Sequence, residues 1–237
     1  MRERELRIVS LISGGGSTME AILNSTVEGE LAGKVKMVAV ITDRVTPGIS
    51  KATLRGIQGY IIDRKRFTSS EQWGEIIIKA CKDSRTDILL LNGLLSLMPQ
   101  NVIEEYLGRI FNQHSADPLY FGGKGMYGLR VHAAVLGFQE KVQRRFPTTA
   151  VIHHVTPIYD EGEIVAKKDV EVCDGDTPEV LAQRVLPHEH AAQIDFLGKL
   201  YEGKVQVLKR DKPLVRPGEE HILYQAKEEA INMYKKK

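Results

Sequence analysis

The sequence predicts an α/β fold, namely a Rossmann-like, mostly parallel twisted sheet with helices on both faces, extended by a C-terminal antiparallel hairpin. Three observations lead to this prediction. Short apolar runs rich in β-branched residues alternate with helical patterns through the first half of the chain. The first run ends in a dense glycine turn that opens a helix. Late in the chain, two strand patterns follow each other across a short turn, which indicates an antiparallel pair.

The first half of the chain predicts five strands with a helix between each pair. Because strands alternate with helices, parallel pairing through right-handed crossovers is the economical arrangement. A capping box of Ser69 and Gln72 is expected to start the third helix. The expected strands cover residues 6–12, 35–42, 60–63, 87–91 and 109–113, and the helices begin near residues 17, 49, 69 and 99.

The second half begins with a glycine-rich stretch, 115–128, which we expect to be a long loop. A helix over 129–141, strands over 149–155 and 164–172, a long helix from Thr177 to Tyr201, a small edge strand over 205–208 and a last amphipathic helix should follow. We expect one domain over 1–208, with halves of about 1–110 and 111–208, and a C-terminal extension over 209–237.

Composition argues against several classes of protein. The 33 Lys and Arg residues nearly balance the 31 Asp and Glu residues, which removes the electrostatic reason to expect nucleic acid or an acidic membrane as partner. The two cysteines, Cys81 and Cys173, lie far apart without ligand-like neighbours, so neither a disulfide framework nor a metal site is expected. No apolar run approaches the ~20 residues that span a bilayer. The sequence therefore predicts a cytoplasmic protein without a metal.

The glycine turn after the first strand predicts an anion site. Backbone N–H groups at the start of the next helix, with the hydroxyls of Ser17 and Thr18, suit a phosphate. Two alternatives stay open. The glycines would simply form a tight turn, or the turn would serve a nucleotide-binding oxidoreductase with Asp43 as its ribose-binding acid, although Met19 stands where that fingerprint has its third glycine.

A polar pair follows the fifth expected strand. Asn112 and His114 are two residues apart, so they project to the same side of the strand at the carboxyl edge of the sheet. An amide donor and a titratable imidazole suit acyl transfer, because they can stabilise a developing oxyanion and move a proton. A structural role for a single histidine is the alternative.

The order of these parts resembles the phosphoribosylglycinamide formyltransferase family. That family combines a glycine-serine turn, an Asp-to-Gly segment, an N-x-H motif, a segment ending in D-x-G, and a late Glu-His pair. The resemblance covers roughly residues 6–208, and it is the combination that is specific. The matching segments here are 13–17, 87–93, 112–114, 153–162 and 189–190.

By this resemblance, Asn112, His114 and Asp160 correspond to the catalytic residues. The resemblance implies transfer of a formyl group from 10-formyltetrahydrofolate to the amine of glycinamide ribonucleotide, without a metal. It also implies three binding groups. The acceptor's phosphate would meet Gly15, Gly16, Ser17 and Thr18, its ribose would meet Glu189, and the folate would meet Leu95, Ser96, Leu97, Thr156, Ile158 and Tyr159.

The chain departs from the family's pattern at several positions. Thr18 replaces an asparagine and Ser115 replaces a proline, while Ser70 and Ser96 stand where the family has arginines. Lys65, Lys124 or Arg130 would be the replacement cations. We expect 121–128 to be a lid whose Lys124 reaches the acceptor, with an idle surface loop as the alternative, and we expect His132 to lie behind the catalytic residues.

Other acceptors stay open within such an enzyme: the amine of a sugar nucleotide, an aminoacyl-tRNA, or water. The glycine-serine turn favours a small phosphorylated acceptor, and the balanced charge argues against tRNA. A folate-binding regulatory protein without activity is a further alternative. The expected partners are therefore small molecules, and the sequence leaves a homodimer open.

Overall fold

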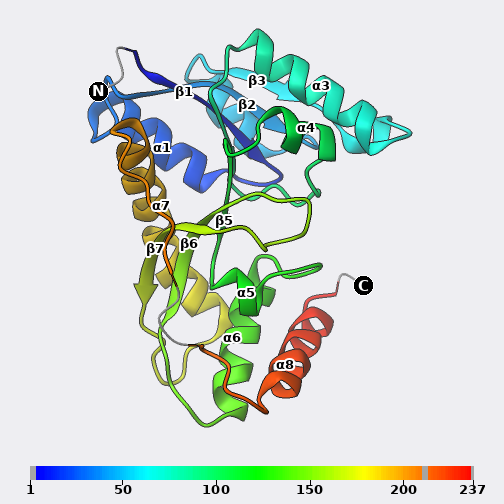
Figure 1. Ribbon diagram of the computed structural model, residues 1–237, viewed down its shortest axis with the longest axis vertical. Helices are drawn as coiled ribbons and strands as arrows, with labels where there is room; N and C mark the ends of the chain where they lie inside the picture. The colour runs from blue at the N-terminus through cyan, green and yellow to red at the C-terminus, as the bar shows by residue number, and fades with distance from the viewer. Residues whose placement is uncertain (1–3, 210–212, 236–237) are drawn as a thin grey trace.

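The computed structural model describes residues 4–209 and 213–235. One seven-stranded sheet in the order β3-β2-β1-β4-β5-β6-β7 forms its centre (Figure 1). The strands are β1 (Leu6–Ile12), β2 (Val35–Thr42), β3 (Gln58–Ile61), β4 (Ile88–Leu91), β5 (Ile110–His114), β6 (Thr148–His154) and β7 (Ile164–Val170). The helices are α1 (Ser17–Glu28), α2 (Pro47–Thr53), α3 (Ser70–Asp83), α4 (Gln100–Glu105), α5 (Pro118–Phe121), α6 (Leu129–Lys141), α7 (Pro178–Tyr201) and α8 (Glu220–Met233), with a 3₁₀ turn η1 (Arg64–Arg66).

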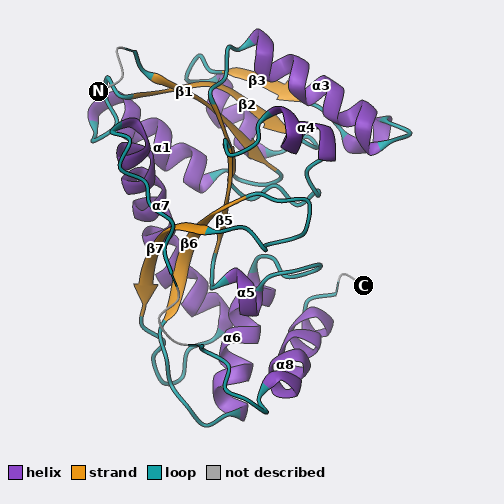
Figure 2. Cartoon of the chain, in the orientation of Figure 1, coloured by secondary structure: helices purple, strands orange, loops and turns teal. Residues whose placement is uncertain are grey.

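The sheet confirms the predicted fold class. Strands β1 to β5 pair in parallel, whereas β6 pairs antiparallel with β5 and β7 antiparallel with β6 (Figure 2). The strand order reverses at β1, because β2 lies on one side of it and β4 on the other. Open α/β sheets bind their ligands outside the carboxyl ends of the strands at such a reversal. The turns that follow β1, β4 and β5 therefore define the place to look for a site.

Helices cover both faces of the sheet because the strands are apolar on both sides. Met19 and Ile22 of α1 and Phe196 of α7 pack against one face. Trp73 and Ile77 of α3, with residues of α4, pack against the other. The parallel strands are thereby buried as a rigid platform, and the connections at their carboxyl ends are left to carry function.

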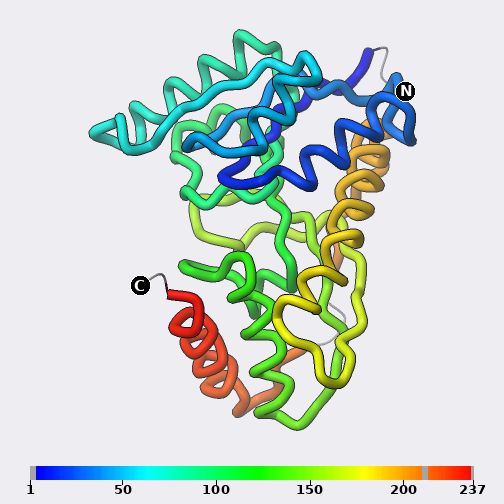
Figure 3. The backbone as a smooth tube through the Cα atoms, turned by 180° about the vertical axis from the view of Figure 1, so that it is seen from behind, coloured from blue at the N-terminus to red at the C-terminus, as the bar shows by residue number. Residues whose placement is uncertain are grey.

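The C-terminal helix α8 packs beside α6 rather than on the sheet. The two helices run side by side in the views from both sides (Figures 1 and 3). Ala226 and Ala230 of α8 are buried in a third apolar cluster with Phe138 of α6. Small side chains let the helix axes approach closely, so α8 is held firmly against the end of the molecule that contains β6 and β7.

Four predictions about local structure need correction. The loop over 115–128 contains the short helix α5, whose Asp117 side chain accepts from the Leu119 N–H, a capping signal that Asp117-Pro118 already carried. Residues 205–208 do not form a strand, because within the described part of the chain Leu208 alone among them has a backbone N–H bonded to another strand, at 2.8 Å from the Ile164 carbonyl. The strand expected over 60–63 is β3, which begins and ends two residues earlier.

The capping box at α3 is only half formed. Ser69 accepts from the Gln72 N–H at 3.1 Å, as expected. The Gln72 side chain does not reach back to Ser69, since its Oε1 accepts from the Thr68 hydroxyl at 2.7 Å instead. One hydroxyl thus caps the helix, and its neighbour takes the reciprocal bond.

Within residues 4–209 and 213–235, no helix is both long and apolar enough to cross a membrane.

Candidate active site

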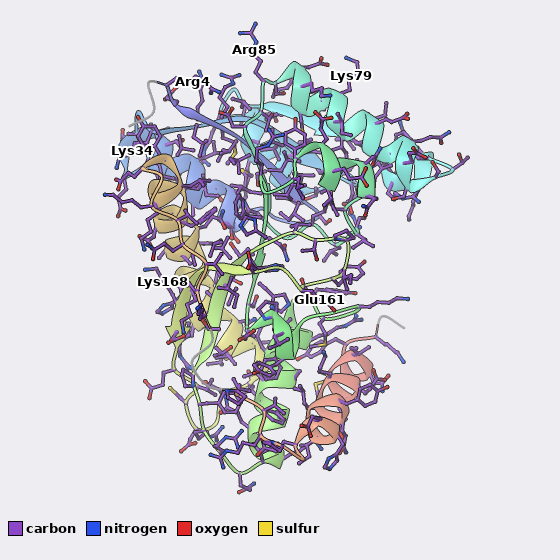
Figure 4. All side chains as sticks on the ribbon, in the orientation of Figure 1. Arg4, Lys34, Lys79, Arg85, Glu161 and Lys168 are labelled. Atoms are coloured by element: carbon purple, nitrogen blue, oxygen red, sulfur yellow. The ribbon has the colours of Figure 1, made fainter. Side chains whose placement is uncertain are left out.

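A cavity of about 360 Å³ lies where the order of the sheet reverses. Its walls come from the start of α1, the carboxyl ends of β4 and β5, the loop before α6, the connection from β6 to β7, and α7. In Figure 4, Glu161 marks where the β6–β7 connection passes close to the loop that follows α5. Asn112, His114 and Asp160 all line this cavity.

The three side chains converge as the resemblance implied. The Asn112 Nδ2 donates to Asp160 Oδ1 at 3.3 Å. His114 Nε2 lies 3.8 Å from Asp160 Oδ2, so protonation of the imidazole would create an ion pair there. His114 Nδ1 lies 3.0 Å from the Ala116 carbonyl, which fixes the ring. Among the residues that the structure describes, His114 Nε2 has no hydrogen-bond partner, so its hydrogen-bonding capacity is not used within the protein.

His153 is a member of this cluster that sequence reasoning did not assign. It lies directly opposite Asn112 in the β5–β6 ladder, and its Nε2 is 3.1 Å from the Asn112 Nδ2. Its Nδ1 lies 2.8 Å from the His154 carbonyl, which requires a proton on Nδ1 and leaves Nε2 to accept. Burial, partly offset by the His154 carbonyl, lowers the pKa of His153 to about 4. A neutral His153 therefore orients the Asn112 amide with its N–H groups toward Asp160.

Asp160 is held by the loop that precedes α6. The Gly123 N–H donates to Asp160 Oδ2 at 2.8 Å. Asp160 itself has a φ of 58°, a left-handed conformation that non-glycine residues adopt at a cost of about 1 kcal/mol or more. Gly122 leaves the room that Asp160 needs, because a Cβ there would stand 2.6 Å from Asp160 Cβ. The carboxylate position thus depends on two adjacent glycines.

His132 lies behind this cluster, on α6. It is buried, and it is not among the residues that line the cavity. Burial, together with the nearby His114, lowers the pKa of His132 to about 4. A neutral imidazole at this position leaves any positive charge on His114.

The glycine turn leads into the start of α1, which lines the cavity. Gly16 precedes α1 with a φ of 64°, and neither Gly15 nor Gly16 is among the residues that line the cavity. No side chain caps α1, so its first N–H groups remain available to an anion. Ser17 and Thr18 line the cavity, and the Thr18 hydroxyl accepts from the Gln113 Nε2 at 3.2 Å. The start of α1 thus presents backbone donors to the cavity beside two hydroxyls.

Asp43 has a structural role, which removes the sequence basis of the oxidoreductase alternative. Its side chain is 1% exposed and pairs with Arg44 at 2.9 Å. It also accepts from the Ser96 hydroxyl at 2.7 Å. Burial opposes ionisation, but the hydrogen bonds from Arg44, Ser96 and Ser13 outweigh it and lower the pKa of Asp43. The carboxylate ties the end of β2 to the loop after β4 and is not free to bind ribose.

One side of the cavity is apolar and exposed at its rim. This side combines backbone segments from two loops, which suits a flat heterocycle that needs amide donors, carbonyl acceptors and apolar contact. Ser96 is tied to Asp43, and the Thr156 hydroxyl donates to the Ile158 carbonyl at 2.9 Å. All six residues expected to hold a folate line this side: Leu95, Ser96, Leu97, Thr156, Ile158 and Tyr159.

Glu189 lines the cavity from α7. It is 7% exposed, and its Oε1 accepts from the Ser115 hydroxyl at 2.6 Å. Burial raises the pKa of Glu189, and hydrogen bonds from Ser115 and Gln113 only partly oppose this. The serine that replaces the family's proline is therefore a partner of this carboxyl group.

The replacement cations suggested by the sequence do not line the cavity. Lys124 and Lys65 are exposed and lie outside the lining. Arg130 is already engaged, since it donates to the Gly125 and Tyr234 carbonyls at 3.0 Å each. None of the described residues that line the cavity is a lysine or an arginine. The described residues also contain no group of three His, Cys, Asp or Glu side chains arranged to hold a metal.

Comparison with known proteins shows which proteins this chain is similar to. The sequence model of the formyl transferase family matches residues 6–197. The chloroplastic phosphoribosylglycinamide formyltransferase of Arabidopsis thaliana is 32% identical over 214 residues, which are 90% of this chain and 71% of the relative. The crystal structure of phosphoribosylglycinamide formyltransferase from Brucella melitensis is 34% identical, with a TM-score of 0.71 over 86% of this chain and 100% of that one. Glycinamide ribonucleotide transformylase 1 from Symbiobacterium toebii is 26% identical, with a TM-score of 0.76 over 88% and 96% of the two chains.

Proposed function

We infer that this chain, which belongs to the formyl transferase family, transfers a formyl group from 10-formyltetrahydrofolate to the amine of glycinamide ribonucleotide in de novo purine biosynthesis. The observation that carries the proposal is the convergence of Asn112, His114 and Asp160 on one cavity beside the uncapped start of α1. These groups suit formyl transfer to a phosphorylated amine. The amide and the imidazole can stabilise a developing oxyanion, the carboxylate can help to move a proton, and the helix start can hold a phosphate. We place the reaction in the cytoplasm.

The reaction forms a C–N bond between the acceptor amine and the formyl carbon and breaks the bond from that carbon to N10 of the folate. One proton moves from the amine to N10. Asn112 and protonated His114 would donate to the formyl oxygen as negative charge develops on it. Asp160, within 3.8 Å of His114 Nε2, would stabilise the imidazolium and help to relay the proton. The donor supplies an already activated carbonyl, so we propose no metal.

The acceptor would lie along the start of α1 and reach toward α7. Backbone donors near Gly15 and Gly16, with the hydroxyls of Ser17 and Thr18, would hold its phosphate, and the dipole of α1 would add positive potential. Glu189 would accept from its ribose hydroxyls. The lining of the cavity by Ser17, Thr18 and Glu189 supports this orientation.

The folate would occupy the apolar side. Leu95 and Leu97 are 44% and 43% exposed and Ile158 is 59% exposed, and all three line the cavity, so together they offer apolar contact to a bound folate. Backbone groups of these two loops would bind the pterin edges. His114, whose Nε2 has no hydrogen-bond partner among the described residues, lines the same cavity as this rim, so a folate bound here would lie beside the imidazole.

Lys124 would contribute only after the loop closes. Its side chain is exposed, and its neighbours Gly123 and Gly125 line the cavity. Both glycines have positive φ angles, 101° and 88°, so the loop carries conformations open to few other residues. Lys124→Ala should raise the KM for the acceptor and leave the KM for the folate unchanged; an unchanged acceptor KM would remove Lys124 from the site.

Incubation of the full-length protein with 10-formyltetrahydrofolate and glycinamide ribonucleotide tests the proposal. We expect release of tetrahydrofolate that depends on the acceptor and is lost in His114→Ala. Release without the acceptor would indicate hydrolysis, and release only with a sugar-nucleotide amine would change the substrate. Folate binding without any release would point to a regulatory protein.

A further inference from the structure

The C-terminal helix α8 approaches the active site through a single lysine. The Lys227 Nζ donates to the Gly122 carbonyl at 2.7 Å. Gly122 and Gly123 share a peptide group, and the N–H of that group donates to Asp160 Oδ2 at 2.8 Å. Lys227 and Asp160 therefore bind opposite ends of one planar peptide unit. Figures 1 and 3 show the end of α8 beside the loop that follows α5.

We propose that Lys227 is a positioning residue of the active site, which fixes the Asp160 carboxylate through the Gly122–Gly123 peptide group. This inference rests on the proposed function. A cation on a carbonyl oxygen polarises the peptide, which makes its N–H a stronger donor to the carboxylate. Because the peptide is planar, fixing its oxygen also fixes the direction of its N–H.

The surroundings of Lys227 suit this role better than that of an ordinary surface lysine. Burial lowers the pKa of Lys227, and attraction to the Asp160 carboxylate partly offsets this. Asp160 itself adopts a left-handed backbone with a φ of 58°, and the loop beside it is built from glycines. A carboxylate on such a backbone keeps its position only if its neighbours hold it. The loop holds it through the Gly123 N–H, which donates to Asp160 Oδ2.

Helix α8 is anchored so that Lys227 stays in place. Ala226, next to Lys227, is buried against α6, where the Cβ that Gly137 lacks would lie 3.9 Å from the Ala226 Cβ. Arg130 of α6 donates both to the Gly125 carbonyl and to the Tyr234 carbonyl just after α8. Lys141 pairs with Glu229 at 3.1 Å. The helix and the glycine loop are thus tied together at two points, Lys227 and Arg130.

This arrangement assigns a function to the C-terminal extension, namely support of the active-site loop. The family match ends at residue 197, and α8 begins at Glu220. The chain beyond the matched segment would therefore supply a part of the active-site framework, although no side chain of α8 lines the cavity. Removing Lys227 should weaken the placement of Asp160 and leave the substrate-binding walls intact.

The test compares Lys227→Met and Lys227→Arg in the full chain, with Lys235→Ala as a matched control that removes an exposed lysine just beyond α8. We expect Lys227→Met to lower kcat about tenfold, the cost of one charge-assisted hydrogen bond, with both KM values unchanged. Lys227→Arg should restore kcat because a guanidinium can donate to the same carbonyl. In an Asp160→Asn background, Lys227→Met should cause no further loss of the residual rate.

Amide hydrogen exchange over residues 121–126 gives a readout that needs no substrate. The Gly123 amide should exchange faster in Lys227→Met than in the wild type or in Lys235→Ala. Equal exchange, an unchanged kcat, or an additional loss in the Asp160→Asn background would each overturn the proposal. Loss of the cooperative unfolding transition in Lys227→Met would also overturn it, since Lys227 would then be structural. If the wild type transferred no formyl group while exchange still responded to Lys227, the proposed function would fail and the Lys227 link would stand.

Discussion

Gly122→Ala is the substitution whose effect on the site can be worked out most directly. Gly122 has a φ of −93° and a ψ of −172°, which alanine adopts without strain, so the effect would come from the added methyl group alone. The atom nearest that Cβ would be the Pro118 carbonyl oxygen of α5, and the Cβ would also stand 2.6 Å from Asp160 Cβ and 2.9 Å from Asp160 Oδ2. Since carbon atoms in contact need about 3.5 Å, Asp160 would have to move by about 1 Å.

A displacement of this size has a predictable cost in rate. Misplacing a reacting group by about 1 Å lowers the rate about 10²-fold, which corresponds to ~2.7 kcal/mol in activation free energy. We therefore expect kcat for formyl transfer to fall about 10²-fold in Gly122→Ala, with a loss of about 1–3 kcal/mol in the free energy of unfolding from overpacking. Steady-state assays of tetrahydrofolate release and urea unfolding measure the two effects.

Gly137→Ala is the matched control, because a Cβ there would meet only the Ala226 Cβ, at an ordinary contact distance of 3.9 Å. It lies within α6, so alanine should raise the free energy of unfolding by about 0.5–1 kcal/mol and leave kcat unchanged. If Gly122→Ala kept kcat within about threefold of the wild type, the position of Asp160 would not limit the reaction and the reasoning would be refuted.

Two further predictions concern buried ionisable groups. Burial raises the folded pKa of Glu189, so its contribution to stability is greatest at acidic pH and falls as pH rises through that value. Glu189→Gln should therefore be more stable than the wild type at pH 8 but not at pH 4. An equal difference in the free energy of unfolding at both pH values would contradict this. The KM for the acceptor should rise about tenfold. Burial lowers the pKa of His132 to about 4, so stability is complete above the unfolded value of 6.5 and declines as pH falls toward 4. In His132→Leu, the free energy of unfolding measured with a chemical denaturant should fall by about 3 kcal/mol less than in the wild type as pH decreases. An unchanged dependence of that free energy on pH would show that His132 is not buried in its neutral form.

The parts of the fold that follow from local chemistry could be predicted from the sequence. Alternating apolar runs and helix-start signals predicted the parallel sheet, and the Thr177-Pro178 signal predicted the start of α7 correctly. The pattern at 205–208 misled because apolar residues do not form a strand without a paired neighbour. Among the described residues, the Leu208 N–H makes the single backbone bond from this segment to β7, at Ile164. Local propensity therefore predicted elements well only where tertiary pairing agreed with it.

The candidate site shows the same division. The strand period placed Asn112 and His114 on one side, and the family resemblance added Asp160. His153 opens the matched segment 153–162, but no role was assigned to it from the sequence, since its contact with Asn112 depends on the register of the β5–β6 ladder. Lys227 was further out of reach, because 105 residues separate it from Gly122. Roles that depend on long-range register require coordinates.

Ser70 and Ser96 stand where the family has arginines, and the structure suggests that the acceptor's phosphate is accommodated without a replacement cation. The sequence suggested Lys65, Lys124 and Arg130 as replacement cations, and none of them lines the cavity. A phosphate can also be tolerated by reducing the negative charge near it. Burial raises the pKa of Glu189, which brings this carboxyl group closer to neutrality, while the uncapped start of α1 offers about half a positive charge. Anion binding here would then depend on the backbone dipoles of α1 and on how far the Glu189 carboxyl group is protonated. The affinity for the phosphate should therefore change more with pH, through the ionisation of Glu189, than with the loss of any single lysine.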